Sequence, residues 1–193
     1  MSYKAPLNDM LFNIKHLANI DQIAQLPGME DAGFDTAQAV LEEAAKFNEG
    51  VLEPLNWEGD QNPTSWKDGT VTATPGFKEA FTQYTEAGWQ GLQHPVAYGG
   101  QGLPKTIGSA VGEMQNSANM SFALLPLLTD GAIEALLTAG STELNATYLE
   151  KLVSGQWTGT MNLTEPQAGS DLAAVRTRAE PQADGTYKIA GTK

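Results

Sequence analysis

The hydrophobic pattern of this chain changes its period once, close to residue 156. Before that point apolar residues recur every three or four positions, which is the spacing of amphipathic helices. Beyond the Gly-Ser-Asp run at 169–171, apolar and polar residues alternate over 174–179 and 187–190, as in half-buried strands. We therefore predict a mainly α fold, with a helical bundle over residues 1–155 followed by the first strands of a β-domain over residues 156–193.

The predicted β-part is too small to form a domain by itself. Asp184 and Gly185 lie between the two alternating runs and favour a hairpin. A sheet made of these strands alone has unpaired edges and little core. The sequence also stops at Lys193, within the second run. This pattern is typical of a truncated domain.

Capping residues and prolines predict the ends of the first helices. An amphipathic helix is expected over residues 7–17. Asp35 is a good N-cap for the next helix, because Gln38 occupies the capping-box position three residues later. Pro54 is expected to close that helix, since proline cannot donate the next backbone hydrogen bond.

The later helices carry similar signals. We expect them to begin at Thr74, Pro104 and Ser141, and the last of them to end at Gly155. Pro126 lies within the most apolar stretch and is expected to kink or break its helix.

Two tryptophans lie in a polar stretch, residues 56–73, which is predicted to be a loop. Trp57 and Trp66 could anchor this loop on the bundle or contact a ligand. We favour anchoring, because an indole ring offers a large apolar area for burial.

One segment, residues 161–171, marks the transition between the two parts. Its sequence is Met-Asn-Leu-Thr-Glu-Pro-Gln-Ala-Gly-Ser-Asp, and its start is expected to be extended. Glu165 precedes a proline, which disfavours the helical region for this residue. The small residues that follow let a backbone approach a ligand closely, and consecutive amides in a turn can bind an anion. A plain turn between two strands is the alternative interpretation.

Three stretches of the chain resemble the acyl-CoA dehydrogenases. The run Thr-Glu-Pro-x-Ala-Gly-Ser-Asp, followed by Val-x-Thr-x-Ala, resembles the flavin signature that links an N-terminal helical domain to a central β-domain. Residues 95–103 resemble the glycine loop before a helix beside the acyl-chain pocket, although Val96 and Ala97 stand where many relatives have acidic residues. The first residues resemble the N-terminal extension, here 1–34, of a bacterial long-form branch that includes 3-(methylthio)propanoyl-CoA dehydrogenases.

The resemblance implies FAD as the cofactor and an acyl-CoA thioester as the substrate. It implies that Met161 and Leu163 line the flavin and that Thr164 hydrogen-bonds the edge of the ring. Gly169 and Ser170 would meet phosphate, and Ser170 would also lie near the bound thioester. For each of these residues strand packing or turn geometry is the alternative.

The activity implied by the resemblance is α,β-dehydrogenation of the acyl group, with FAD accepting the hydride. Glu165 is not assigned as the base, because in the family this glutamate belongs to the flavin loop. The base is expected beyond Lys193, so no catalytic residue is assigned here and the fragment alone is expected to be inactive. An electron-transfer flavoprotein is the implied partner, and the complete protein is expected to be a homo-oligomer. The alternatives are an acyl-CoA oxidase and a non-catalytic helical interaction module with a vestigial flavin loop.

The composition argues against several classes of partner and binding site, and it bears on the cellular compartment. A formal net charge of -12 argues against nucleic acid and anionic membrane surfaces. The chain has no cysteine and only two distant histidines, His16 and His94, so no metal site is expected. The apolar stretch 122–139 is interrupted by Pro126, Asp130 and Glu134, which favours a buried helix over a membrane span. Without a secretory signal at its start, the protein is expected to be soluble and cytoplasmic.

Overall fold

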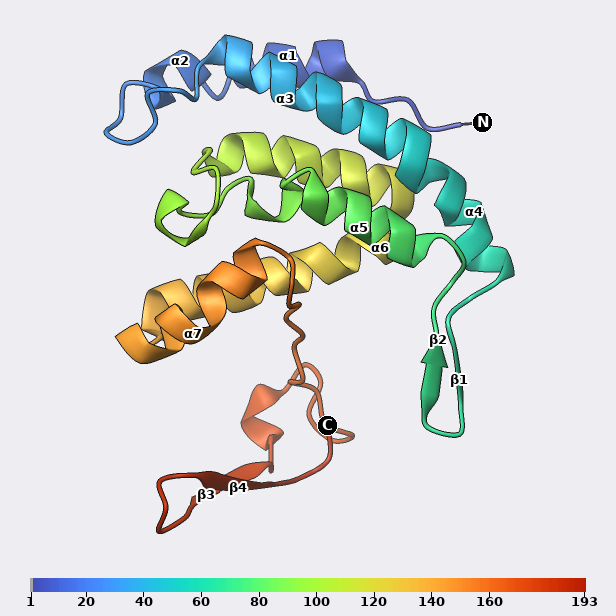
Figure 1. Ribbon diagram of the computed structural model, residues 1–193, viewed down its shortest axis with the longest axis vertical. Helices are drawn as coiled ribbons and strands as arrows, with labels where there is room; N and C mark the ends of the chain where they lie inside the picture. The colour runs from blue at the N-terminus through green and yellow to red at the C-terminus, as the bar shows by residue number, and fades with distance from the viewer. Residues whose placement is uncertain (1) are drawn as a thin grey trace. The chain divides into compact units, whose positions relative to one another are not determined.

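The chain folds into two compact units. The structure, a computed structural model, describes residues 2–193; the first unit ends at Gly159 and the second spans Thr160–Lys193. Figure 1 shows the first unit as helices coloured from blue to orange with one green hairpin, and the second as loops, a short helical turn and two strands in red. The mainly α fold predicted from the sequence is confirmed.

Helices form most of the first unit. A π-turn over Asn48–Leu52 joins two of these helices, and one small hairpin is inserted after them. The helices and strands of this unit are α1 (Leu7–His16), α2 (Ile20–Ile23), α3 (Phe34–Phe47), α4 (Glu53–Gln61), β1 (Ser65–Lys67), β2 (Thr70–Thr72), α5 (Phe77–Glu86), α6 (Lys105–Ala139) and α7 (Thr142–Val153).

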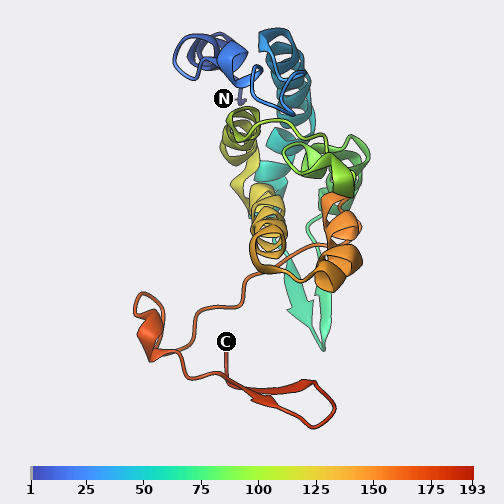
Figure 2. The same cartoon turned by 90° about the vertical axis from the view of Figure 1, so that its left-hand side faces the viewer.

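The core of the first unit lies along α6, which contacts α1, α3, α4 and α7. The first half of α6, residues 105–118, packs against α1 and α3 through apolar side chains that include Ile14, Leu41 and Val111. The second half, residues 120–139, packs against α7 through Ile133 and Leu149. Figure 2 shows α6 between the α1–α3 layer and α7. Helical periodicity therefore located the buried faces of α3 and of the first half of α6, whereas Leu17 after α1 and Leu144 and Tyr148 of α7 are exposed.

The long helices do not break at the two prolines where the sequence predicted breaks. Pro54 does not close α3, because the chain continues through the π-turn into α4 with this proline in the first turn. The carbonyl that its ring would obstruct is that of Gly50, four residues earlier and inside the π-turn, where the hydrogen bonds have shifted to i→i+5. Pro126 lies within α6, but the non-helical residue of that helix is Asn119.

Two of the predicted caps are wrong, and one is confirmed. Asp35 lies in the first turn of α3, and the cap comes instead from Asp21 of α2, whose Oδ1 accepts a hydrogen bond from the Phe34 amide at 3.1 Å. Thr74 precedes α5 by a further turn, because Gly76 at φ +84° is the residue that enters the helix. Ser141 does cap α7, since its Oγ accepts from the Leu144 amide at 3.2 Å.

The predicted polar loop after α3 contains regular structure. Beyond α4, the strands β1 and β2 form an antiparallel hairpin in which Trp66 pairs with Val71. The expectation that strands occur only in the second part is therefore wrong. Trp57 and Trp66 are 70% and 71% exposed, so they do not anchor this region on the first unit as we expected.

The second unit is built around one hairpin. Strands β3 (Arg178–Pro181) and β4 (Tyr187–Ala190) pair antiparallel, with Glu180 opposite Lys188. Gly185 in the connecting turn has φ +84°, which explains the Asp-Gly signal. Residues 157–163 are irregular rather than a strand, because no described segment pairs with them.

Helix α6 is long and apolar enough, by length and composition alone, to cross a membrane. The same properties are found in the core helices of soluble proteins. Within the stretch 122–139 five residues are buried, namely Phe122, Ala123, Pro126, Thr129 and Ile133, so this half of α6 is only partly the buried helix that the sequence predicted.

Candidate functional site

The segment with the Thr-Glu-Pro-x-Ala-Gly-Ser-Asp pattern forms a tight turn. Glu165 and Ala168 exchange both backbone hydrogen bonds, each at 3.0 Å, so Pro166 and Gln167 form the tip. Thr164 and Gly169 then lie at neighbouring positions on the two arms of this turn. The turn thus brings together residues from both ends of the predicted site.

The carboxylate of Glu165 holds the turn against the beginning of β3. Its oxygens accept hydrogen bonds from the backbone amides of Arg176 at 2.8 Å and Thr177 at 3.0 Å. The Gln167 side chain donates to the same carboxylate at 2.7 Å. Glu165 is only 4% exposed, so these donors replace the water that burial has removed.

Lys193 completes this arrangement. Its Nζ lies 3.0 Å from the Glu165 carboxylate and donates to the Leu163 carbonyl at 2.9 Å. The Thr177 hydroxyl, the Arg176 amide and the Lys193 ammonium together hold the pKa of Glu165 well below its usual range, against the opposing effect of burial. A general base works best with a pKa near the operating pH. A lowered pKa is unfavourable for a general base at neutral pH, and the hydrogen bonds of Glu165 hold the turn to the start of β3.

Four of the five predicted cofactor-binding residues border this turn, namely Leu163, Thr164, Gly169 and Ser170. All four are exposed, and so is Met161, which lies further along the extended arm. No backbone N–H from residues 161–164, 169 or 170 donates a hydrogen bond within the described part of the chain. A Cβ atom added at Gly169 would have no neighbouring heavy atom within 4 Å.

These residues fit a flavin chemically. A flavin ring has an edge rich in hydrogen-bonding atoms and apolar faces, and the arms of the turn offer unpaired amides, one hydroxyl and exposed apolar side chains. The amides beside Gly169 and Ser170 are suited to phosphate, which such backbone groups bind well. Proline followed by glycine and serine predicted the turn, whereas the flavin contacts of the individual residues were implied by the resemblance to the acyl-CoA dehydrogenases.

The glycine loop of the first unit is organised around His94. Its carbonyl accepts a hydrogen bond from the Gly102 amide at 2.9 Å. A side chain at Gly100 would overlap this carbonyl, so the close approach of the two backbones requires glycine. The loop ends at Pro104, from which α6 starts as predicted.

A polar cluster joins this loop to α6. Asp130 of α6 accepts hydrogen bonds from Gln90 at 2.7 Å, from Gln93 at 3.0 Å and from Nε2 of His94 at 2.7 Å. This cluster is not recognisable in the sequence, because its members lie up to 40 residues apart and follow no motif. His94 is completely buried in it.

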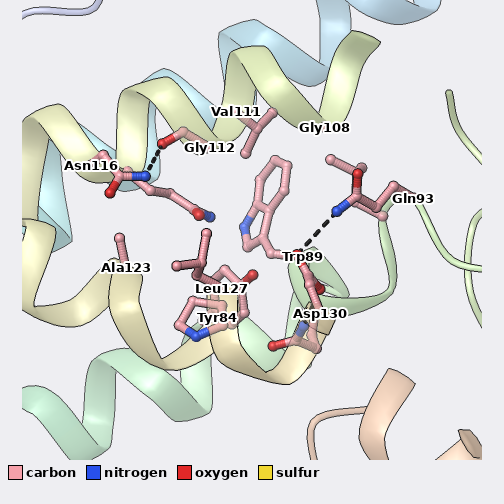
Figure 3. Close-up of a pocket in the computed structure, with 14 residues that line it drawn as sticks. Tyr84, Trp89, Gln93, Gly108, Val111, Gly112, Asn116, Ala123, Leu127 and Asp130 are labelled. Carbon is pink, nitrogen blue, oxygen red and sulfur yellow. Dashed lines mark hydrogen bonds between the residues drawn. The ribbon is translucent and has the colours of Figure 1, made fainter. Parts of the chain in front are cut away.

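A cavity of about 70 Å³ lies beside this cluster, between the two halves of α6 and the segment that follows α5. Figure 3 shows the Trp89 ring among the lining side chains, with Gln93 and Asp130 joined by a hydrogen bond at one end. Val111, Ala123 and Leu127 supply apolar surface. The cavity thus has both apolar and polar walls, with Asp130 and its glutamine partners among the polar groups.

An exposed apolar stripe continues from this cavity along α6. Met120, Leu124 and Leu127 follow one another at helical spacing and are 60%, 49% and 56% exposed. Leu127 also lines the cavity, so stripe and cavity are continuous. Across residues 2–193, no three His, Cys, Asp or Glu side chains gather in a way that could hold a metal ion.

Comparisons with known proteins identify a family and several relatives. The family described as "Acyl-CoA dehydrogenase, N-terminal domain" matches residues 35–156. The chain is 49% identical over its whole length to 3-methylmercaptopropionyl-CoA dehydrogenase of Ruegeria pomeroyi, and 34% identical over its whole length to a butyryl-CoA dehydrogenase of Syntrophomonas wolfei. It covers 33% and 32% of these two relatives, so it spans about a third of their length.

A solved structure shows the same fold. An acyl-CoA dehydrogenase from Bacillus anthracis, complexed with FAD, superposes on 80% of this chain with a TM-score of 0.67 and 25% sequence identity. The superposition covers 25% of that protein.

Proposed function

Because this chain belongs to the acyl-CoA dehydrogenase family, we propose that it is the N-terminal part of an FAD-dependent oxidoreductase that dehydrogenates an acyl-CoA thioester. The observation that carries the proposal is the family match over residues 35–156, followed directly by the Glu165–Ala168 turn with its unpaired amides. We also propose that residues 1–155 are the helical domain, with 1–34 as an extension, and that 156–193 begin a central β-domain.

The proposed role of the turn is to hold the flavin. FAD would supply the hydride-accepting chemistry. Leu163 and Met161 would cover an apolar face of the ring, and the Thr164 hydroxyl would hydrogen-bond its edge. Gly169 and Ser170 would direct backbone amides at phosphate, with the Ser170 hydroxyl available to the thioester. Glu165 keeps these groups in place and exchanges no proton.

The proposed role of the α6 stripe is to contact the acyl chain. Three exposed apolar side chains on one helical face are costly in water unless something covers them. Met120, Leu124 and Leu127 lead to a cavity with an apolar wall, which suits a hydrocarbon chain. The base that takes the α-proton is expected outside these residues.

The proposed partners and the proposed cellular location rest on membership of the same family. We propose an electron-transfer flavoprotein as electron acceptor, a homo-oligomeric assembly and a cytoplasmic location. An oxidase would instead pass electrons to oxygen. Oxygen uptake by the complete gene product, with and without an electron-transfer flavoprotein, distinguishes the two enzymes.

One experiment tests the proposal as a whole. The complete gene product is purified, its bound flavin is identified, and butyryl-CoA is added without oxygen. We expect stoichiometric FAD whose visible absorption is bleached by the substrate. A protein that binds no flavin, or whose flavin no acyl-CoA reduces, would instead support a non-catalytic helical module.

A further inference from the structure

The cavity beside α6 has an open end and a closed end. Leu127 and Asn116 line it and are exposed, so they belong to its mouth. Gln90 is buried and Gln93 is half-buried, and both bond to Asp130, so these three lining residues form the inner polar end. Figure 3 shows Gln93 and Asp130 together, away from Asn116. A water-sized group needs about 10–15 Å³ of such a volume, so the cavity of about 70 Å³ has room for about five heavy atoms.

Asp130 presents the hydrogen-bond pattern of an ionised carboxylate. The Gln90 amide and the His94 ring nitrogen both contact Oδ1 at 2.7 Å, and the Gln93 amide donates to Oδ2 at 3.0 Å. Both oxygens therefore act as acceptors, which a protonated carboxyl group could do only in part. The Asp130 side chain retains 31% exposure, which leaves it partly open to the cavity.

The charge of Asp130 is not balanced by its neighbours. Nδ1 of His94 is buried without a hydrogen-bond partner among the described residues. A proton there would create a buried, unpaired N–H, so the tautomer that fits carries its single proton on Nε2. The two glutamines are neutral, and no lysine or arginine is found among the described lining residues. The inner end of the cavity is therefore negative.

We propose that Asp130 is a specificity-determining residue that admits acyl groups with a neutral end and rejects those that end in a carboxylate. The inference rests on the proposed function, because it assumes that the cavity receives the end of the acyl chain. A second carboxylate placed here would face a like charge in a partly buried site, where water screens the repulsion poorly. Gln90, Gln93 and His94 act by fixing the position of the Asp130 side chain.

The test compares valeryl-CoA with glutaryl-CoA, which has the same number of acyl carbons but ends in a carboxylate. Binding to the complete gene product is measured by calorimetry without an electron acceptor, and kcat/KM is measured with one. The parent protein is expected to prefer valeryl-CoA. In Asp130→Asn the preference should fall by about ten- to a hundredfold, the effect of removing one like charge at about 6 Å.

Two further variants sharpen the comparison. Gln93→Lys keeps the Asp130 carboxylate and replaces its neutral donor with a cation, and should reduce the preference in the same direction even if Asp130→Asn fails to fold. Glu134→Gln removes a carboxylate on the same helix that lies outside the cavity and pairs with Lys105, and should leave the preference unchanged.

The outcomes separate this inference from the proposed function. If the parent protein dehydrogenates valeryl-CoA but neither Asp130→Asn nor Gln93→Lys alters the preference, the inference is overturned and the function stands. If the parent protein neither binds nor dehydrogenates either thioester, both are overturned. An equal shift in Glu134→Gln would show a general effect of charge and would also overturn the inference.

Discussion

The Asn119 side chain donates a hydrogen bond to the Leu52 carbonyl at 3.0 Å, joining the break in α6 to the π-turn between α3 and α4. The Oδ1 atom of the same side chain accepts from the Phe122 amide at 3.0 Å, which is the geometry of an N-cap. One buried asparagine therefore satisfies backbone groups of two irregular helix segments at once. This explains why α6 changes direction at Asn119 rather than at Pro126.

We expect Asn119→Ala to destabilise the first unit by about 1–3 kcal/mol. The change removes a helix cap and leaves the Leu52 carbonyl buried without this donor. Urea unfolding followed by circular dichroism measures the loss. Asn116→Ala is the matched control, because that exposed side chain bonds only to the Gly112 carbonyl of its own helix. Equal stabilities of Asn119→Ala and the parent chain would contradict a structural role for Asn119.

We expect Thr164→Val to weaken FAD binding in the complete gene product by about 1–3 kcal/mol. The substitution keeps the shape of the side chain but removes the hydroxyl, so a buried flavin atom would lose its partner. Flavin titration measures the change, and helical content should stay the same. Thr186→Val is the control, because this threonine bonds to Asp184 in the β3–β4 turn of the same unit. Unchanged FAD affinity in Thr164→Val would remove the cofactor role.

We expect Ser170→Ala to weaken binding of the phosphate or of the thioester. The loss should be similar to, or smaller than, the loss of FAD binding expected for Thr164→Val. The neighbouring backbone amides remain in this variant, so only one donor is lost. Steady-state kinetics with butyryl-CoA, together with FAD titration, locates the loss. An exposed serine in the first unit, Ser154, provides a Ser→Ala control outside the turn. If Ser170→Ala matches that control in both assays, the turn has only a structural role there.

Glu165 should remain ionised well below the pH at which ordinary glutamates titrate. Its folded-state pKa is lowered, so its stabilising effect is fully present above the unfolded pKa of about 4.3. The effect is lost only as the pH falls through the lower folded pKa. The amide resonances of Arg176 and Thr177 report it directly, since both amides bond to this carboxylate. They should stay constant from pH 7 to about pH 4.

Glu165→Gln separates the structural role from a catalytic one. The variant should weaken the protection of the same two amides from hydrogen exchange at pH 7, whereas Glu180→Gln at an exposed position of β3 should not. In the complete gene product it should bind less FAD but keep measurable turnover per bound flavin. Turnover abolished at full flavin content would instead identify Glu165 as the base.

The 193-residue chain by itself should not dehydrogenate acyl-CoA. The base is expected outside these residues, and the chain spans about a third of the length of the relatives that it matches. We expect no reduction of an artificial electron acceptor above the blank when FAD and butyryl-CoA are added. Turnover by this chain alone would show that the base lies within these residues.

The amino-acid sequence was sufficient for features that depend on local or periodic signals. Apolar spacing located the longer helices and the buried faces of α3 and the first half of α6, because burial of one face is what stabilises a helix in a bundle. It did not reveal α2 or α4. The Ser141 cap, the Asp184–Gly185 turn and the Thr-Glu-Pro turn each depend on a few neighbouring residues with special backbone preferences.

Only the tertiary structure decided the features that join distant segments. Proline is a helix breaker, yet α6 does not break at Pro126. Its break follows from the hydrogen bond between Asn119 and Leu52, which are 67 residues apart. Asp130 was only an interruption of an apolar stretch until the fold placed two glutamines and His94 around it. Periodicity and capping signals depend on interactions within a single helix or strand. A buried polar group, by contrast, can be satisfied by any donor that packing brings within about 3 Å, however distant in sequence.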